Sequence, residues 1–349
     1  METSTTNQLF SKDDLKKLII PLLFEQALAI TVGMADTVMI SSAGEAAVSG
    51  VSLIDMFNNL IISVLAALAT GGAVVTSQFL GAGKKEDACK SAKQLIVSSV
   101  CITIGISILV MVFCNGIISL FFGKIEADVF HNAVIYMMIS ALSFPFLALY
   151  NSCAALFRSM GNSQITLKVS VVENIINIGG NALGVYVLGL GVAGVAIATV
   201  VSQAISCVLV LRCLYKSEGS YQLRFSKLCL KKDYIIPIFQ VGIPAGIQST
   251  VINFSNVLLQ SSVNSFGSIA MAGYTAANNV LGFLYTSVNS VTQACMSFTS
   301  QNYGVGKYKR MDKVLIDCLI LSSGIALVMG GGAYLFGTEI LQIYTGDPE

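Results

Sequence analysis

The sequence predicts an all-α polytopic membrane protein. Three observations predict it: an apolar composition, nine apolar stretches of membrane-spanning length, and an internal repeat. The 349 residues are 54% hydrophobic and 11% charged, whereas an ordinary soluble chain has about 25% charged residues. The mean hydropathy of +0.76 agrees with this. A water-soluble globule is therefore excluded.

The composition also excludes several classes of function. A net charge of +1 provides no electrostatic field for a nucleic-acid partner. The nine cysteines are scattered without a CxxC motif, so they are expected to be free thiols and not a metal or disulfide framework. The single histidine, His131, cannot form a histidine metal site. No secretory signal is recognisable, and no cofactor or enzymatic activity is expected.

Nine stretches have the roughly 20 apolar residues that a helix needs to cross a bilayer. Short polar segments separate them. Several contain Gly, Pro and Asn, which membrane helices tolerate when neighbouring helices satisfy the freed backbone groups. We place the spans at residues 15–40, 51–79, 94–121, 131–157, 165–188, 191–213, 234–262, 269–300 and 314–336.

The basic residues orient these spans. With nine spans, 19 of the 20 Lys and Arg residues fall on one side, including Arg158 and Lys168 in the loop after the fourth span, and Lys124 alone falls on the other. Basic loops face the cytoplasm in membrane proteins. The N-terminus is therefore predicted to be cytoplasmic, in a bacterial inner (plasma) membrane.

An internal repeat appears when the chain is shifted by 223 residues. Pro21 then aligns with Pro244, and the string TSQxxGxGK from Thr76 aligns with the same string from Thr299, without a gap. Many secondary transporters contain such repeats. Six spans per repeat give two halves of the same orientation, so two complete repeats would need about a hundred residues more than the chain has. Either the chain is a truncated product or evolution has trimmed the second half, and the abrupt ending TGDPE favours truncation.

Ionisable side chains at membrane depth are costly and indicate function by default. Four acids qualify: Glu25, Asp36, Asp55 and Glu173. Glu25 and Asp36 are eleven residues apart, close to three full helical turns, so they share one face of the first span. Pro21 is expected to bend that span. Asp36 would lie in its outer third.

The fifth span carries a second polar stripe, Glu173, Asn177 and Asn181, at i, i+4 and i+8. Thr199 of the sixth span and Tyr136 of the fourth are expected at a similar depth as Asn181. Carboxylate, amide and hydroxyl oxygens together are the ligands that Na⁺ or a proton relay would use. A Na⁺ site is therefore expected at Asp36, Asn177, Asn181 and Thr199.

Structural explanations compete with these functional ones. Asn and Thr in membrane helices commonly bond a neighbouring helix, Glu25 could cap a helix kink, and Asp55 could serve as a hydrogen-bond acceptor. The repeat favours function for the acids of the first span, because the second half lacks both. The aligned pairs are Glu25 with Gln248, Asp36 with Leu259, and Asp55 with Asn278.

Four strings give the chain a resemblance to the multidrug and toxic compound extrusion (MATE) family of secondary transporters. They are PLLFEQALAITVGMADTVMISSAGEAAVSGV from Pro21, NSCAALFRSMGNSQITLKVSVVENIINI from Asn151, GLGVAGVAIATVVSQ from Gly189 and TSQNYGVGK from Thr299. The resemblance covers residues 10 to 349. It implies a two-lobed bundle with a V-shaped cavity, with about nine of the family's twelve transmembrane helices present. The family exports cationic, lipophilic compounds in exchange for H⁺ or Na⁺.

The resemblance also assigns coupling residues. The family aspartate, fifteen residues after the helix proline, corresponds to Asp36, and the family tyrosine, asparagine and threonine correspond to Tyr136, Asn177 and Thr199. Some members carry a second aspartate where this chain has Asn181, which removes one of two carboxylates. The acids that another branch carries in its second lobe have no candidate in the seventh span.

These inferences predict a multidrug efflux antiporter whose partners are small cationic or lipophilic drugs and membrane lipid; the family suggests a monomer. The expected domains are an N-lobe at 1–215, a cytoplasmic linker at 216–232 and a partial C-lobe at 233–349. A lipid or oligosaccharide flippase remains an alternative, although it needs a cationic cavity and the basic residues are assigned to loops. A prenyl-transfer enzyme would need clustered aspartates, and no DxxD motif occurs within a span. A truncated, transport-inactive polypeptide is the third alternative.

Overall fold

The computed structural model describes residues 12–123, 125–216, 231–264 and 268–337, and within these ranges it consists of helices and short turns without a strand. The predicted all-α fold is confirmed. Most of the predicted linker at 216–232, as well as Lys124 and the C-terminal TGDPE, lie outside the described residues.

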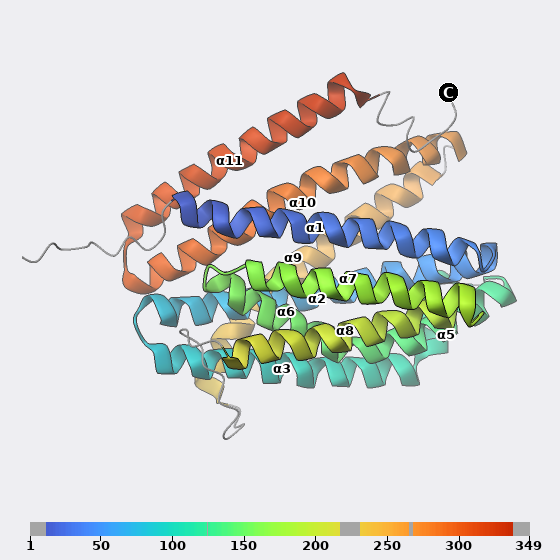
Figure 1. Cartoon of the computed structure of the whole chain (residues 1–349), viewed down its shortest axis with the longest axis horizontal. Helices are drawn as coiled ribbons and strands as arrows, with labels where there is room; N and C mark the ends of the chain where they lie inside the picture. The colour runs from blue at the N-terminus through green and yellow to red at the C-terminus, as the bar shows by residue number, and fades with distance from the viewer. Residues whose placement is uncertain (1–11, 124, 217–230, 265–267, 338–349) are drawn as a thin grey trace, which may run out of the picture.

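In the described part of the chain the helices form nine successive rods, which run roughly parallel to one axis (Figure 1). They correspond in order to the nine expected spans. Three are interrupted: the third span consists of α3 and a short α4, the fourth is divided by a 3₁₀ turn near Pro145, and the fifth ends in a π turn. The helices are α1 (Lys12–Ser41), α2 (Glu45–Gly81), α3 (Lys85–Val112), α4 (Cys114–Phe122), α5 (Ala127–Ser140), η1 (Ala141–Ser143), α6 (Phe144–Ser159), α7 (Gln164–Ala182), η2 (Leu183–Val187), α8 (Gly191–Lys216), α9 (Lys232–Asn264), α10 (Ser268–Val305) and α11 (Tyr308–Leu335).

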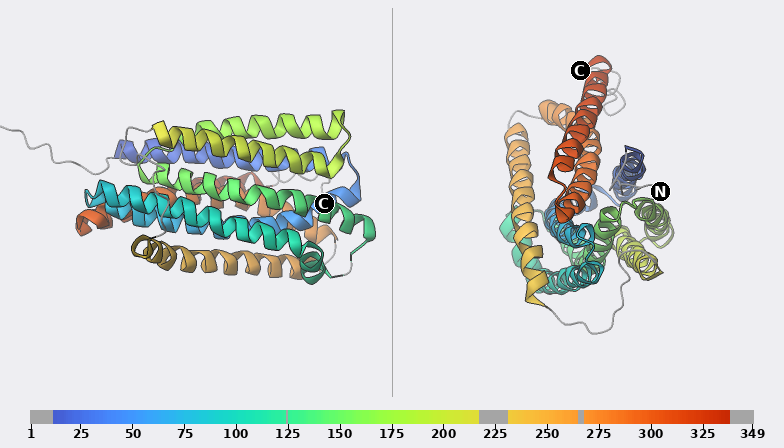
Figure 2. Two further views of the ribbon diagram at one scale, coloured as in Figure 1. Left: turned by 90° about the horizontal axis from the view of Figure 1, so that it is seen from below. Right: turned by 90° about the vertical axis from the view of Figure 1, so that its left-hand side faces the viewer.

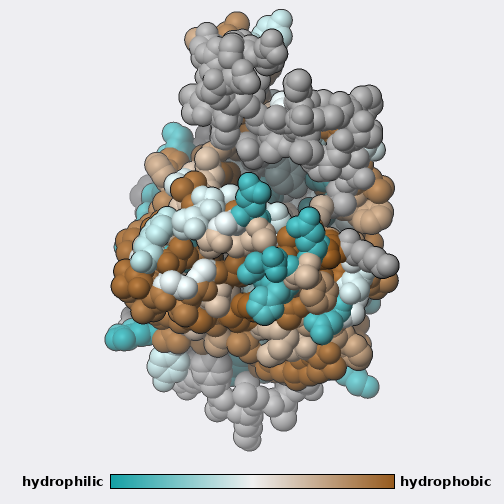
Figure 3. Space-filling view, turned by 90° about the vertical axis from the view of Figure 1, so that its right-hand side faces the viewer, coloured by the Kyte–Doolittle hydropathy of each residue, from teal (hydrophilic) through white to brown (hydrophobic). Residues whose placement is uncertain are grey.

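Seven helical segments in the described part of the chain are long and apolar enough to cross a membrane. The two other rods, α7 and α10, are richer in polar residues. Hydrophobic side chains cover much of the outside of the rods. On the end of the bundle where α1 stops, polar residues gather over the middle and hydrophobic residues surround them (Figure 3). The molecule is thus a multi-span membrane protein.

The internal repeat is visible in the helix boundaries. Shifted by 223 residues, α2 would end at Gly304 and α3 would cover residues 308–335, and the structure has α10 ending at Val305 and α11 at Tyr308–Leu335. The turns that join these helices are also equivalent. Gly83 has φ 74° and Gly306 has φ 77°, a left-handed conformation that favours glycine. The repeat is therefore present in the structure as well as in the sequence.

The first six rods form one packed body, and the second repeat packs against it mainly through α2, with further contacts of α10 to α1 and of α9 to α3 (Figure 2). Two clusters of buried residues hold the first body together, around Ile54, Met137 and Phe144 at one end and Leu95, Leu156 and Phe157 at the other. Helices α9 and α10 both contact α2, whereas α11 packs on α10 and is largely exposed. Helix α2 therefore lies at the centre of the molecule, between the two repeats.

Candidate functional site

Two groups of polar side chains lie inside the first body, one toward each end of α1. We call them the Asp36 cluster (Asp36, Asp55, Tyr136, Asn177, Asn181, Thr199) and the Glu25 cluster (Glu25, Arg158, Thr166, Glu173). All eight acid, amide and hydroxyl residues predicted from the sequence fall into one of them. Arg158 and Thr166 were not predicted.

The Asp36 cluster joins α1, α7 and α8 through a chain of hydrogen bonds. Asn181 Nδ2 donates to Asp36 Oδ1 at 2.5 Å and to Asn177 Oδ1 at 3.1 Å. Asn177 Nδ2 in turn donates to Thr199 Oγ1 at 3.2 Å, and Thr199 donates to the backbone carbonyl of Val195 at 3.0 Å. Since Asn177 and Asn181 are buried on one face of α7, the helical spacing seen in the sequence places them together. The structure therefore brings four of the predicted residues into one network.

Asp55 and Tyr136 form the second part of this cluster. The Tyr136 hydroxyl, on α5, donates to Asp55 Oδ1 of α2 at 3.0 Å. Asp36 and Asp55 are close enough for their charges to interact. The contact supports the explanation of Asp55 as a hydrogen-bond acceptor. Asp55 is also a second carboxylate at this end of the first body, in addition to Asp36.

One buried atom of the Asp36 cluster lacks a partner. Among the described residues, Asn181 Oδ1 accepts no hydrogen bond. Buried polar atoms nearly always have one. An unpaired oxygen beside a carboxylate is the arrangement that a bound cation would complete. Carboxylate, amide and hydroxyl oxygens make up this cluster, and oxygen ligands are those that hard cations prefer.

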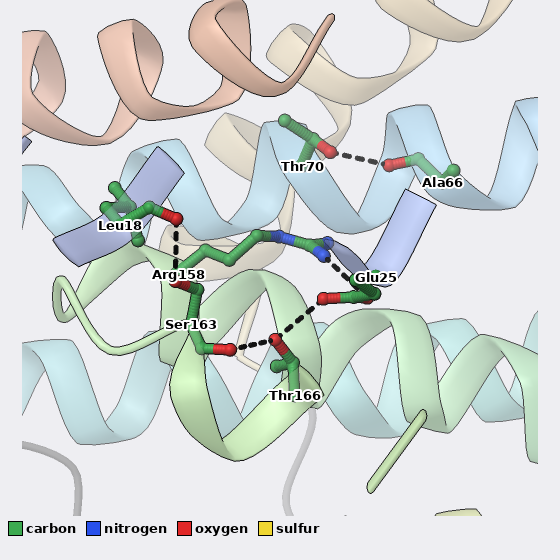
Figure 4. Close-up of polar contacts among 7 residues, drawn as sticks. All are labelled: Leu18, Glu25, Ala66, Thr70, Arg158, Ser163 and Thr166. Atoms are coloured by element: carbon green, nitrogen blue, oxygen red, sulfur yellow. Dashed lines mark hydrogen bonds and ion pairs between the residues drawn. The ribbon is translucent and has the colours of Figure 1, made fainter. Parts of the chain in front are cut away.

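The Glu25 cluster lies in the other half of α1. Thr166 Oγ1 of α7 donates to Glu25 Oε2 at 2.8 Å, and Arg158 Nη1 of α6 lies 3.7 Å from Glu25 Oε1 (Figure 4). Glu173 is near enough to interact electrostatically with Glu25. The cluster is buried: Glu25 is 9% exposed and the side chain of Arg158 is 14% exposed.

The prediction that Arg158 and Lys168 belong to a cytoplasmic loop is wrong, because α6 includes Arg158 and α7, which begins at Gln164, includes Lys168. Helix α6 continues to Ser159, so Arg158 occupies its last turn and its long side chain runs back into the bundle toward Glu25. The position of Arg158 in the sequence could have revealed that it belongs to the helix. It directly follows the apolar run CAALF, and two residues separate it from the Gly-Asn pair of the next turn. No comparable signal distinguishes Thr166.

Near Glu25, Pro21 leaves a gap in the hydrogen bonds of α1. A proline has no N–H, so the carbonyl of Lys17 loses its helical donor. Helix α1 nevertheless continues without a break, and the Ser163 hydroxyl lies 3.4 Å from that carbonyl and 2.7 Å from the carbonyl of Leu18 (Figure 4). The Ser163 carbonyl lies 2.9 Å from Thr166 Oγ1, so it shares the single hydrogen of that hydroxyl with Glu25. The proline, the serine and the acid thus form one local structure.

A cavity of about 470 Å³ lies between α2 of the first repeat and α9 and α10 of the second. Its polar lining is uncharged and its apolar lining is made of small and aliphatic residues. Asn253 Nδ2 donates to Ser63 Oγ at 3.0 Å across it. Gln248, the repeat partner of Glu25, also lines it. The polar lining residues are Ser63, Thr70, Gln248, Ser249, Asn253, Tyr285, Asn289, Thr292 and Gln293.

The sequence and the fold of this chain are similar to those of known membrane transporters. The family model described as MatE matches residues 21–183 and again residues 244–349, so its two matches begin at the repeat-related Pro21 and Pro244. An uncharacterized transporter of Bacillus subtilis, YisQ, is 25% identical over 94% of this chain and 73% of its own length. A probable multidrug resistance protein of Thermotoga maritima, NorM, is 24% identical over 97% of this chain and 73% of its own. A solved structure described as the outward-facing conformation of a multidrug resistance MATE family transporter superposes with a TM-score of 0.90 at 19% identity, over 99% of this chain and 78% of that one.

Proposed function

This chain belongs to the MatE family of membrane transporters, and we propose that within that family it is a multidrug exporter driven by the exchange of H⁺ or Na⁺. It is a transporter and not an enzyme. The proposed cargo is a set of small cationic or lipophilic compounds, and the proposed location is a bacterial inner membrane with the N-terminus in the cytoplasm.

The cavity supports the choice of cargo. Its walls combine small aliphatic groups with neutral hydrogen-bonding side chains, such as Asn253 and Gln293, which suit varied amphiphilic compounds. Several relatives carry names that denote multidrug resistance or export, among them NorM of Thermotoga maritima. The cavity also lies between the two repeats, where secondary transporters bind their substrates.

The Asp36 cluster supports the coupling mechanism, and one observation carries it. Asn181 donates to Asp36 with its amide nitrogen while its amide oxygen remains buried and unpaired. A cation that neutralises Asp36 would remove the cost of a charge at membrane depth. Because the cluster joins α1 to α7, binding or release of that cation changes the contact between the two helices. A difference in cation affinity between two arrangements of the bundle is what exchange requires.

The test uses proteoliposomes that contain the full chain, loaded with a cationic dye and given an inward Na⁺ or H⁺ gradient. Asp36→Asn is expected to abolish gradient-driven dye movement, whereas Asp13→Asn, a change at an exposed acid of the same helix, should leave it unchanged. Dissipating each gradient separately identifies the coupling ion. Gradient-driven movement that persists in Asp36→Asn would refute the proposed role of this residue.

The flippase alternative needs several cations around the cavity to hold a diphosphate. Among the described residues that line the cavity and the small hollow that adjoins it, Arg158 is the single cation. A separate hollow between α1 and α11 is lined by one cation, Lys16, and by the acid Asp317. Export of small compounds therefore remains the better-supported function.

A further inference from the structure

Arg158 occupies a position that its ion pair with Glu25 does not explain. Its side chain lines a small hollow beneath the cavity between the repeats, together with Thr70 and Ser77 of α2 and with Gln293 and Ser300 of α10. The hollow and the cavity share four lining residues, so they adjoin. Among the described residues that line these two adjoining spaces, Arg158 is the one charged side chain.

The guanidinium is also incompletely paired. It carries five N–H donors that suit bidentate binding of a carboxylate. Within the described residues its one acidic contact is Glu25, at 3.7 Å, which is longer than a hydrogen bond. The other oxygen of Glu25 already accepts from Thr166 at 2.8 Å. A side chain that served only to neutralise Glu25 would be expected to make a closer, two-point contact.

The surroundings favour an anionic group on the side of the hollow. Neither Glu25 nor Glu173 lines it, so an anion that enters meets the guanidinium first. A compound carrying both a carboxylate and a cation would bring its own compensating charge and leave the cluster electrically unchanged. We propose that Arg158 is a subsite for the carboxylate of zwitterionic cargo; this rests on the proposed export function.

The size of the hollow indicates at which stage of the transport cycle the subsite can bind cargo. At about 20 Å³ it has room for about one water molecule. It is bounded by α2, α6 and α10. Just beyond it, Gln301 Nε2 of α10 donates to the carbonyl of Ser159 of α6, and Gly81 of α2 lies against the backbone of Gln301. In this arrangement a carboxylate is excluded. Separation of α2 and α10 at this end opens the subsite to cargo, and their closure expels the carboxylate toward the cavity.

The test compares two dyes that differ in one group: a xanthene dye with a free benzoic acid, which is a zwitterion, and its methyl ester, which is a cation. Both are measured in proteoliposomes with the full chain. The variant Arg158→Gln/Glu25→Gln removes both charges of this ion pair, so Glu25 is not left as a buried carboxylate without its cation. Arg158→Lys keeps the charge and loses the bidentate geometry, and Lys309→Gln, at an exposed position, is the control.

We expect the double variant to lower transport of the acid relative to the ester by about tenfold, the loss of a charged hydrogen bond, with Arg158→Lys between it and the wild type. Lys309→Gln should keep the wild-type ratio. An unchanged ratio in the double variant, or a wild type that moves the ester and not the acid, overturns the subsite. The proposed function fails separately: Asp36→Asn would then leave movement of both dyes intact, while the acid-to-ester ratio still reports on Arg158.

Discussion

Gly81 lies so close to the backbone of Gln301 that a Cβ at Gly81 would stand 2.1 Å from the Gln301 carbonyl oxygen. The repeat-related Gly304 has the same relation to Gln78, at 2.0 Å. Helices α2 and α10 therefore cross in direct backbone contact around a local twofold axis that relates the two repeats. The TSQxxGxGK string recurs because each copy supplies a glycine that the other copy packs against.

This contact leads to a first prediction. Gly81→Ala forces α2 and α10 apart, because no carbon atom can occupy a position 2.1 Å from a carbonyl oxygen. A reporter cysteine at Ser300, in a chain whose native cysteines have been replaced, should then react faster with a water-soluble thiol reagent. Ser300 is 5% exposed, so the wild-type background should react slowly.

Gly105→Ala is the matched control, because nothing lies within 4 Å of a Cβ built there. It should leave the labelling rate of Ser300→Cys unchanged. Equal labelling rates in the Gly81→Ala and wild-type backgrounds would show that the contact of Gly81 with Gln301 does not hold the ends of α2 and α10 together.

A second prediction concerns the repair of α1 around Pro21. Ser163→Ala removes the hydroxyl that lies 2.7 Å from the carbonyl of Leu18 and 3.4 Å from that of Lys17. A buried hydrogen bond of this kind contributes about 1 kcal/mol. The melting temperature of the purified chain should fall by a few degrees, measured by thermal unfolding in detergent.

Ser41→Ala provides the comparison for this change. Its hydroxyl bonds the carbonyl of Val38 at an exposed site, where water can replace it. A melting temperature that falls equally in both variants would argue against a specific role for Ser163.

The fold was predictable because the membrane makes its requirements regular. Apolar length identifies the nine rods, and the gap-free register of the repeat relates α10 and α11 to α2 and α3. Helix interruptions were not predictable. The turn near Pro145 and the π turn after Ala182 depend on how neighbouring helices satisfy the backbone, and periodicity does not report this.

The site was predictable where its residues share a helix face. Glu173, Asn177 and Asn181 follow one stripe, and the structure assigns Asn177 and Asn181 to the Asp36 network. Contacts between distant helices could not be derived in this way. The pairing of Tyr136 with Asp55, and that of Arg158 with Glu25, depend on the relative rotation of rods that the sequence does not specify.

A third prediction tests the pairing of Tyr136 with Asp55. Tyr136→Phe removes the hydroxyl that donates to Asp55 at 3.0 Å and leaves the carboxylate partly buried without that donor. A hydrogen bond to a charged group contributes about 1.5–3 kcal/mol. The variant should be less stable than the wild type at neutral pH, and the difference should shrink in acid, where a protonated carboxyl group no longer needs the donor. Thermal unfolding as a function of pH measures this.

Tyr186→Phe controls for the loss of a hydroxyl in general, since Tyr186 is 58% exposed. It should unfold like the wild type at every pH. If Tyr136→Phe shows a stability difference that does not depend on pH, the hydroxyl contributes through packing and not through the charge of Asp55.

The last prediction concerns the amide that stands beside Asp36. Asn181→Asp replaces an N–H donor, 2.5 Å from Asp36 Oδ1, with a second carboxylate. Two carboxylates at this distance cannot both be ionised without a cation between them. The variant should therefore bind Na⁺ or a proton more tightly than the wild type, and a tenfold gain in affinity corresponds to about 1.4 kcal/mol of added stability at saturating cation.

The melting temperature of Asn181→Asp is measured against Na⁺ concentration, at constant ionic strength with choline as the replacement, and against pH. Asn181→Asp/Asp36→Asn returns the site to one carboxylate and should lose the added dependence. A variant Asn181→Asp that responds to Na⁺ and to pH as the wild type does would show that Asn181 faces no cation site, and it would leave Asp36 to act with Asp55 instead.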